Sequence, residues 1–308
     1  MKKVLIFLLA ILGGQLMSSE KLYSQQDAQY TQYMYNMNIL NPAYAGSKEN
    51  TLSISLLGRS QWLGIPGAPQ TATMSVHSDI TDRMGLGLSV YADKIGPINE
   101  QFIFADYSYT IPVGYYDNLA FGVKAGVSVV NARLTDLLTN NPDINFTENL
   151  KTLKPNFGFG AFYYGDNYYA GVSIPNLLRT QYLKTTGDVV TSISKKSHLF
   201  ITGGYVFDLN YIWRFKPSTM IKTTMGAPLS IDLSANFLYD EAFEVGASYR
   251  WDDSLSLVLG AYVTDNLRIG YSYDFTFTEL NKFNSGSHEL ILLFDILTNY
   301  EIISPRFF

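Results

Sequence analysis

A strict two-residue alternation of apolar and polar side chains, sustained over long runs, is the feature that most constrains the fold of this chain. In the clearest run, 267–277, the apolar set is Leu267, Ile269, Tyr271, Tyr273, Phe275 and Phe277, and the other set is Arg268, Gly270, Ser272, Asp274 and Thr276. Successive side chains of a β-strand point to opposite faces, so this period predicts a strand rather than a helix. A run of this length suits a tilted membrane strand of roughly 9 to 11 residues better than a globular strand of about 5 or 6.

Four other segments alternate in the same way: 86–93, 119–129, 231–239 and 243–251. One face of each segment is rich in Leu, Val, Phe and Tyr, and the other carries Gly, Ser and charged residues. A soluble sandwich or soluble barrel also alternates, but its second face would meet water and would not need so many small residues. The pattern therefore favours a membrane barrel with an apolar outer face.

Composition agrees with a membrane barrel. Charged residues make up 16% of the chain, against roughly 25% in an average soluble protein, and aromatic residues reach 15%. Aromatic residues gather at the ends of the runs, where the interfacial girdles of a barrel lie. These are Tyr115, Tyr116, Tyr163, Tyr164, Tyr168, Tyr169, Tyr239, Trp251 and Tyr262.

The connections predict how the strands are joined. Tight turn signals such as Asp117-Asn118, Asp240-Glu241 and Asp265-Asn266 separate several runs, whereas long polar connections occupy 132–153, 177–197 and 278–287. Short turns at one end and long loops at the other are typical of an outer-membrane barrel. We therefore expect an all-β fold, a transmembrane antiparallel β-barrel of about 14 strands over 51–297, followed by a C-terminal tail over 298–308.

The N-terminus has the pattern of an export signal. Lys2 and Lys3 precede the apolar run Val4–Gly13, and small and polar residues follow as far as Ser24. This run is shorter than the roughly 20 apolar residues that a spanning helix requires. Residues 1–24 are therefore predicted to be a signal peptide that is removed on export, so the mature protein is either soluble outside the cytoplasm or built as a membrane barrel. The alternation favours the barrel, and with it a location in the outer membrane.

The residues that would carry enzymatic or metal chemistry are scarce. There is no Cys, which excludes disulfides, thiolate metal sites and a lipid-modified N-terminal cysteine, and the three His residues, His77, His198 and His288, lie in separate segments. No nucleophile-elbow, phosphate-loop or zinc-ligand spacing is present, and Asp252-Asp253 is typical of a turn rather than of a calcium site. We expect no catalytic residues, no cofactor and no metal, and the lack of a Lys/Arg cluster argues against a nucleic-acid partner.

Several charged side chains fall on the face predicted to line the lumen. They are Lys124, Lys222, Asp232, Glu244, Arg250, Arg268 and Asp274. A channel or catalytic role is one interpretation. Cross-strand pairing of Asp232 or Glu244 with Arg250 or Arg268 is the favoured one, because charges that water only partly reaches need partners.

An ordered set of motifs gives the chain a family resemblance. The opening Gln25–Asn36 (QQDAQYTQYMYN), Asn41–Ser47 (NPAYAGS), Arg59–Gly64 (RSQWLG) and Gly67–Thr71 (GAPQT) are similar to the PorP/SprF family of type IX secretion proteins. The likeness continues through Asp93–Pro97, Lys216–Ser218, Gly226–Pro228, Tyr249-Arg250, Gly270–Asp274, Gly286–Glu289 and Ser304–Phe308. Ala28 where Pro is expected, and the unusual Asn36–Asn38 step, are mild departures.

The resemblance implies a function that composition does not supply. It implies a non-enzymatic outer-membrane component of the type IX secretion system that anchors or presents a secreted adhesin or enzyme at the cell surface, with a link to gliding motility. Its partners would be the C-terminal domain of that cargo, periplasmic secretion-machinery or peptidoglycan-binding proteins, and outer-membrane lipid. The motif residues we single out as partner-binding candidates are Tyr30, Tyr33, Tyr35, Asn41, Pro42, Tyr44, Gly46, Arg59, Gln61 and Trp62.

Two questions stay open at this point. The family segment 25–50 either plugs the periplasmic mouth or simply leads into the first strand, and Trp62 suits girdle or turn packing better than a ligand platform. The long connections are our candidates for cargo contact, since binding residues concentrate on loops held by a rigid scaffold. The alternative function is a transporter of hydrophobic small molecules with an N-terminal plug.

Overall fold

The computed structural model describes residues 28–133, 135, 149–178, 180–186, 189–195, 197–224, 227–297 and 306. The predicted signal peptide, most of the 132–153 connection and all of the C-terminal tail except Arg306 lie outside these residues. Within the described ranges, no helix is long and apolar enough to cross a membrane.

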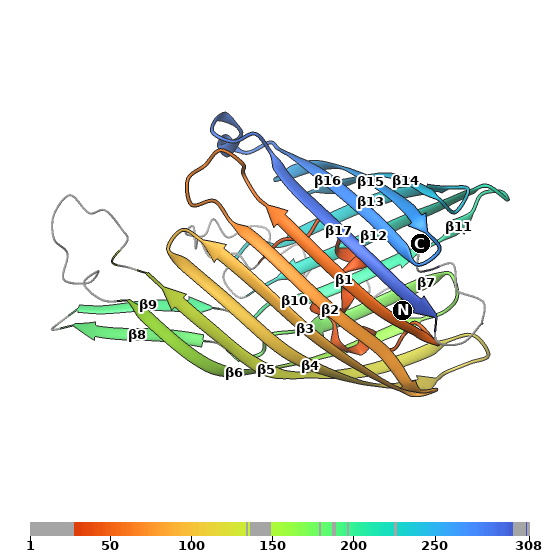
Figure 1. The fold of residues 1–308 in the computed structure, drawn as a ribbon, viewed down its shortest axis with the longest axis horizontal. Coiled ribbons are helices and arrows are strands. Elements are labelled where there is room, and N and C mark those ends of the chain that lie inside the picture. Colours follow the sequence, from red (N-terminus) through yellow and green to blue (C-terminus); the bar gives the residue numbers. More distant parts are fainter. Residues whose placement is uncertain are drawn as a thin grey trace, which may run out of the picture.

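In the described part of the chain, fourteen antiparallel strands close into a barrel (Figure 1). They are β1 (Thr51–Ser60), β2 (Gln70–Thr81), β3 (Met84–Ile95), β4 (Ile98–Pro112), β5 (Asn118–Ala132), β6 (Leu150–Tyr164), β7 (Tyr168–Ile174), β10 (Leu199–Tyr205), β12 (Trp213–Thr223), β13 (Ser230–Tyr239), β14 (Phe243–Arg250), β15 (Ser254–Thr264), β16 (Leu267–Thr276) and β17 (Ser287–Leu297). The ladders between β10 and β12 and between β1 and β17 complete the ring. The predicted barrel of about 14 strands is confirmed.

Three further strands lie outside the ring of fourteen. The short β11 (Phe207–Asp208) pairs only with β12, and β8 (Thr180–Thr186) pairs with β9 (Val189–Lys195) as a separate hairpin inside the connection that was predicted over 177–197. This hairpin projects beyond the barrel in Figure 1.

The four longest connections between barrel strands all lie at one end, which we call the long-loop end. They are 61–69, 133–149, 175–198 and 277–286. The opposite, short-turn end carries 82–83, 113–117, 165–167, 206–212, 240–242 and 265–266. The predicted asymmetry of a barrel that spans an outer membrane is therefore present.

The strand register aligns outward-facing side chains of neighbouring strands into apolar and polar rows on the outer wall. Across neighbouring strands, one outward-facing row is apolar and consists of Leu292, Leu56, Met74, Val90 and Ile103. Two outward positions nearer the long-loop end, the row is polar and consists of His288, Ser60, Gln70, Lys94, Asn99 and Asn131. This change from apolar to polar marks the border of the membrane-facing band at the long-loop end.

The segment over 28–50 lies inside the barrel along its length, and its last residues reach the short-turn end, where the periplasmic mouth was predicted (Figure 1). It contains three short helical turns, η2 (Tyr33–Tyr35), α2 (Met37–Leu40) and η3 (Pro42–Tyr44). Its first residues contact the long-loop end of the wall and its last residues contact the short-turn end. The segment can cross the whole lumen because polar side chains of the wall offer it hydrogen-bond partners along the full length.

Candidate functional site

The segment 28–50 and the wall around it form the candidate site, which begins with a clamp at the long-loop end. The Glu289 carboxylate accepts hydrogen bonds from the backbone N–H groups of Thr31 (3.0 Å) and Gln32 (2.7 Å). Arg59 lies beside it, with Nη1 at 3.1 Å from Glu289 Oε2 and Nη2 at 2.6 Å from Asp274 Oδ2. The Thr31 hydroxyl donates to Asp274 and accepts from Arg59. All these side chains are buried, so each interaction replaces water on both partners.

A second buried ion pair contacts the segment at the long-loop end. Asp232 and Arg250 are direct cross-strand partners, and their carboxylate and guanidinium meet at 2.8 Å. The Arg250 Nη1 also donates to the side-chain oxygen of Gln29 at 2.8 Å, and Gln61 donates to that oxygen at 3.3 Å. The predicted cross-strand pairing of these lumen charges is confirmed.

The middle of the segment is held by one more buried pair. Lys124 and Asp106 are opposite each other on β5 and β4, with 2.7 Å between Nζ and Oδ1. Asn38 bridges them, because its amide nitrogen donates to Asp106 Oδ2 at 3.3 Å and its backbone carbonyl accepts from Lys124 Nζ at 3.3 Å. A helical turn of the segment is thereby tied to two strands of the wall.

Two tyrosines of the family motif anchor the segment to the opposite wall. Tyr33 is fully buried and donates its hydroxyl to Ser218 Oγ at 3.1 Å. Tyr35 donates to Glu244 Oε1 at 2.7 Å, and the Arg268 guanidinium lies over its ring, 3.6 Å from the centroid. A guanidinium at that distance adds a cation–π attraction to the hydrogen bond.

Arg268 and Glu244 form the other predicted ion pair, although they are on strands separated by β15. Gly260 on β15 lies between them, and a Cβ at this position would be 2.7 Å from Arg268 Nη2 and 3.0 Å from Glu244 Oε2. The absence of a side chain at Gly260 is therefore what allows the pair to meet across a strand.

The Asn41-Pro42 motif fits against glycines of β5 and β6. The Asn41 side-chain oxygen accepts from the Ala43 N–H at 3.0 Å, and its amide nitrogen donates to the Ala161 carbonyl at 3.0 Å. A Cβ at Gly122 would overlap the backbone of Pro42 and Ala43, and one at Gly160 would overlap the Asn41 side chain. The motif therefore fits against the wall only because positions 122 and 160 are glycines.

At the short-turn end the segment meets the last strand and Arg306. Lys48 Nζ lies 2.5 Å from Asp295 Oδ2, and the Asn50 N–H donates to Asp79 at 2.9 Å. Arg306 donates to the carbonyls of Ser47 (2.6 Å) and Gly165 (2.7 Å), so it links the segment to the β6–β7 turn.

Most of the ten motif residues that were predicted to bind partners contact the wall of the lumen. Tyr30, Tyr33, Tyr35, Asn41, Pro42 and Arg59 are buried. Tyr44 packs edge-on against the rings of His77 and Phe162, and the Gly46 N–H donates to His77 Nδ1 at 3.4 Å with φ at +70°. Gln61 and Trp62 are half-buried at the long-loop end. Partner binding by these residues stays a prediction.

The sequence analysis did not assign several side chains to contacts around the segment. Asp106, the partner of Lys124, and Lys48 were not singled out at all. Glu289, Lys216 and Arg306 were noted only as parts of family motifs. The strand alternation could have assigned Glu289 and Asp106 to the lumen. Their contacts with residues such as Thr31, 258 positions away along the chain, have no local signal.

Two loops meet at the rim of the long-loop end. The Leu63 N–H donates to the Gly286 carbonyl at 2.8 Å, and the Ser285 N–H donates to the Leu63 carbonyl at 2.7 Å. Trp62, with φ at +50°, donates its N–H to Ser287 Oγ at 3.0 Å. Leu63 and Phe283 remain exposed, at 49% and 72% of their surface. We call the paired loops 61–69 and 277–286 the rim platform.

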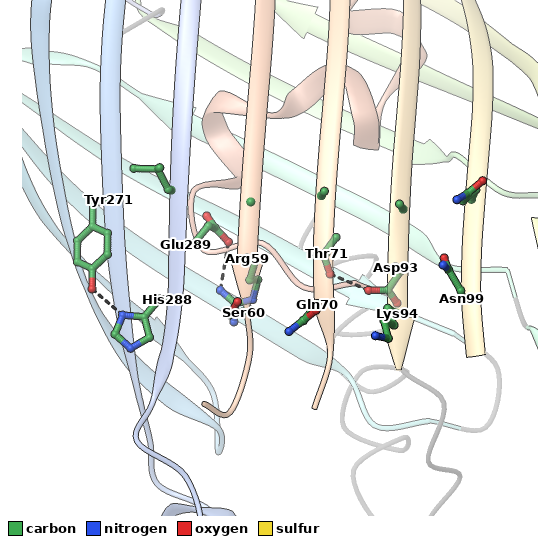
Figure 2. Close-up of a pocket in the computed structure, with 15 residues that line it drawn as sticks. Arg59, Ser60, Gln70, Thr71, Asp93, Lys94, Asn99, Tyr271, His288 and Glu289 are labelled. Atoms are coloured by element: carbon green, nitrogen blue, oxygen red, sulfur yellow. Dashed lines mark hydrogen bonds and ion pairs between the residues drawn. The ribbon is translucent and has the colours of Figure 1, made fainter. Parts of the chain in front are cut away.

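The outer wall below this rim carries a cavity of about 590 Å³ across β16, β17 and β1–β4 (Figure 2). Gly58, Ala72 and Ala92 form a row of small residues in register, and Ser60, Gln70, Lys94 and Asn99 form its polar edge. Figure 2 also shows the Tyr271 hydroxyl directed at His288, at 2.7 Å from Nδ1. Among the described residues, no group of three or more His, Cys, Asp or Glu side chains is placed to hold a metal ion.

A closed antiparallel barrel with an apolar outer band and a polar lumen occupied by its own N-terminal segment defines the chain as an outer-membrane β-barrel protein. The family model of the type IX secretion system membrane protein PorP/SprF matches residues 22–294, and the chain belongs to that family. The predicted family and the outer-membrane location are therefore confirmed.

Solved structures show likeness in fold only. The CymD monoaromatic hydrocarbon channel is 11% identical, with 86% of this chain and 92% of that chain covered and a TM-score of 0.47. A FadL homologue from Pseudomonas aeruginosa is 12% identical, with 81% and 89% covered and a TM-score of 0.46. The toluene transporter TodX from Pseudomonas putida is 10% identical, with 84% and 92% covered and a TM-score of 0.46. No curated protein matches the sequence.

Proposed function

We propose that this component of the type IX secretion system is a non-enzymatic anchor that holds the C-terminal domain of a secreted cargo at the cell surface. The observation that carries the proposal is the occupied lumen. Segment 28–50 crosses it and is fixed by buried ion pairs at Arg59, Lys124 and Arg268. Because the lumen is occupied, the rims and loops of the barrel are the surfaces that can bind a partner.

The rim platform is the proposed contact for the cargo. Outer-membrane barrels direct their long loops outward, so this end faces the cell exterior. Leu63 and Phe283 expose apolar surface beyond the polar row that borders the membrane band, where lipid does not cover it. Exposed apolar groups on a rigid platform are typical of protein-binding sites. The β8–β9 hairpin, which projects at the same end, extends the proposed surface.

The short-turn end is the proposed contact for periplasmic secretion-machinery or peptidoglycan-binding proteins. Tyr115 and Tyr116 in the β4–β5 turn are exposed, and so is Tyr211 between β11 and β12. Aromatic side chains that reach past the strand ends can pack against a periplasmic partner or the lipid interface. In a gliding cell, the two ends together would connect a surface adhesin to the envelope.

The proposal is tested by a double change in the rim platform, Leu63→Ser with Phe283→Ser, in the native host. The expected result is that cargo appears in the medium while the amount of folded barrel in the outer membrane is unchanged. Asp265→Ser in the exposed β15–β16 turn at the opposite end, a residue with no proposed contact, is the control and should leave cargo on the surface. Retention of cargo by the rim variant would contradict anchoring at this platform.

The transporter alternative gives a different result in a simpler experiment. Purified protein in lipid vesicles should not accelerate entry of an aromatic hydrocarbon, because segment 28–50 is bound through the lumen. Saturable uptake by the wild-type protein would favour the transporter instead of the anchor.

A further inference from the structure

Charged side chains on the outer face of the barrel strands are confined to one sector at the long-loop end. Among the outward-facing strand positions that the structure describes, Lys94 on β3 and Lys151 on β6 are the only Lys, Arg, Asp or Glu residues. Both are exposed, and neither forms an ion pair within the described residues. Since these strands present no carboxylate outward, the sector has a positive surface that attracts anions.

The strand register places the two lysines in one polar row. Lys94 pairs with Asn99, Asn99 with Asn131, and Asn131 with Lys151, from β3 to β6. Neighbouring strands are about 4.8 Å apart, so the backbones of the two lysines are about 14 Å apart along the row. The asparagine amides between them offer both hydrogen-bond donors and acceptors. The row therefore has a positive charge at each end and neutral polar groups in its middle.

The cavity of the outer wall begins directly below this row (Figure 2). Its floor is the row of Gly58, Ala72 and Ala92, with Leu290 on the β17 side and Gln101 on the β4 side. A Cβ at Gly58 would meet nothing within 4 Å, so the space above the floor is open. The volume of about 590 Å³ lies within the roughly 300–1,000 Å³ of small-molecule sites.

Lys94 joins the two features, because it lines the cavity and also forms one end of the positive row. The long loops of outer-membrane barrels face the exterior, so this border of the membrane band lies in the outer leaflet. A ligand that suits both features is an amphiphile. Its apolar part would lie over the small residues, and its anionic, hydroxyl-rich part would lie along the row.

We propose that this sector of the outer wall binds one phosphorylated glycolipid of the outer leaflet. Its phosphate groups would accept charge-assisted hydrogen bonds from Lys94 and Lys151. Its sugar hydroxyls would bond to the amides of Asn99 and Asn131, and an acyl chain would lie in the hollow at Ala92. A phospholipid with a single phosphate would reach only one of the two lysines, so the row favours the wider headgroup of a glycolipid.

Direct binding tests this site. The protein is extracted from its native membrane, washed free of lipid in a neutral detergent and titrated with a diphosphorylated glycolipid of the lipid A class, and native mass spectrometry counts the bound lipid. We expect one tightly bound glycolipid per barrel and weaker binding of phosphatidylglycerol. Lys94→Met should weaken glycolipid binding by roughly tenfold, the effect of losing a charge-assisted hydrogen bond. Ala92→Leu should also weaken it, because the larger side chain fills the hollow.

Each variant has a matched control. Lys282→Met removes the same charge from an exposed lysine at the same end, outside the row and the cavity lining. Ala105→Leu adds the same bulk at an outward-facing position of β4 that is nearer the short-turn end and does not line the cavity. Both controls should bind the glycolipid like the wild-type protein. Heat-modified mobility on gels verifies that every variant forms the barrel.

Two results would overturn the proposal. One is equal affinity of the wild-type protein for phosphatidylglycerol and the glycolipid, which would mean that any anionic lipid binds the positive surface. The other is equal affinity of a variant and its control, Lys94 with Lys282 or Ala92 with Ala105, which would mean that the cavity and its row do not form the site. Cargo is absent from these measurements, so their outcome is separate from that of the anchoring experiment.

Discussion

The two ends of the lumen hold the backbone of the same segment with side chains of opposite charge. At the long-loop end, the Glu289 carboxylate accepts from the N–H groups of Thr31 and Gln32, and Arg59 pairs with that carboxylate. At the short-turn end, the Arg306 guanidinium donates to the Ser47 carbonyl. The comparison teaches that charged side chains can fix a segment without regular structure by bonding to its peptide groups, with an acceptor at one end and a donor at the other.

The largest effect is expected from Glu289→Ala, which breaks the long-loop end. It leaves Arg59 with one carboxylate and removes the acceptor of two backbone N–H groups, Thr31 and Gln32. Loss of one member of a buried pair costs about 3–5 kcal/mol. Urea unfolding in lipid vesicles should show this loss, and protease should cut the segment more readily. Glu279→Ala, which removes an exposed ion pair at the rim, should change little.

A smaller loss is expected from Gly260→Ala, which acts on the other end. The new methyl group would be 2.7 Å from Arg268 and would push it away from Glu244. Overpacking of this kind costs about 1–3 kcal/mol in unfolding experiments. Gly203→Ala on β10 is the control, because its nearest neighbour would be at 3.6 Å, an ordinary contact. Equal stability of the two variants would show that the Arg268–Glu244 pair does not depend on Gly260.

The smallest effect is expected from Tyr33→Phe, between the two ends. The change removes the hydroxyl that donates to Ser218 and keeps the ring in place. We expect a loss of about 1 kcal/mol, the usual value for one buried hydrogen bond. Tyr211→Phe, at a fully exposed position, should be neutral in the same unfolding measurement. A Tyr33 variant as stable as the wild-type protein would mean that the two ends alone hold the segment.

The wall of the barrel could be predicted far better than its contents. Alternation assigns each side chain to a face, and the tight turn at Asp240-Glu241 fixes a register in which Asp232 lies opposite Arg250. Alternation alone could not establish the contact between Arg268 and Glu244, because this ion pair reaches across β15 at Gly260.

The position of segment 28–50 could not be derived in the same way. Its partners, such as Glu289 and Asp106, lie far away along the chain, and no periodicity connects them with Thr31 or Asn38. Family resemblance pointed to Tyr30, Tyr33, Tyr35 and Asn41 as important residues. It carried no information about what they touch, and the structure shows them packed against the wall.

The clamp at Arg59 and Glu289 has a consequence for how the protein is assembled. These two residues are opposite each other in the ladder that joins the first barrel strand to the last, so their pairing forms part of the seam of the barrel. The same carboxylate accepts the N–H groups of Thr31 and Gln32. The strand pairing that closes the barrel and the contact that holds the start of the segment therefore share one carboxylate, so a change at Glu289 affects both.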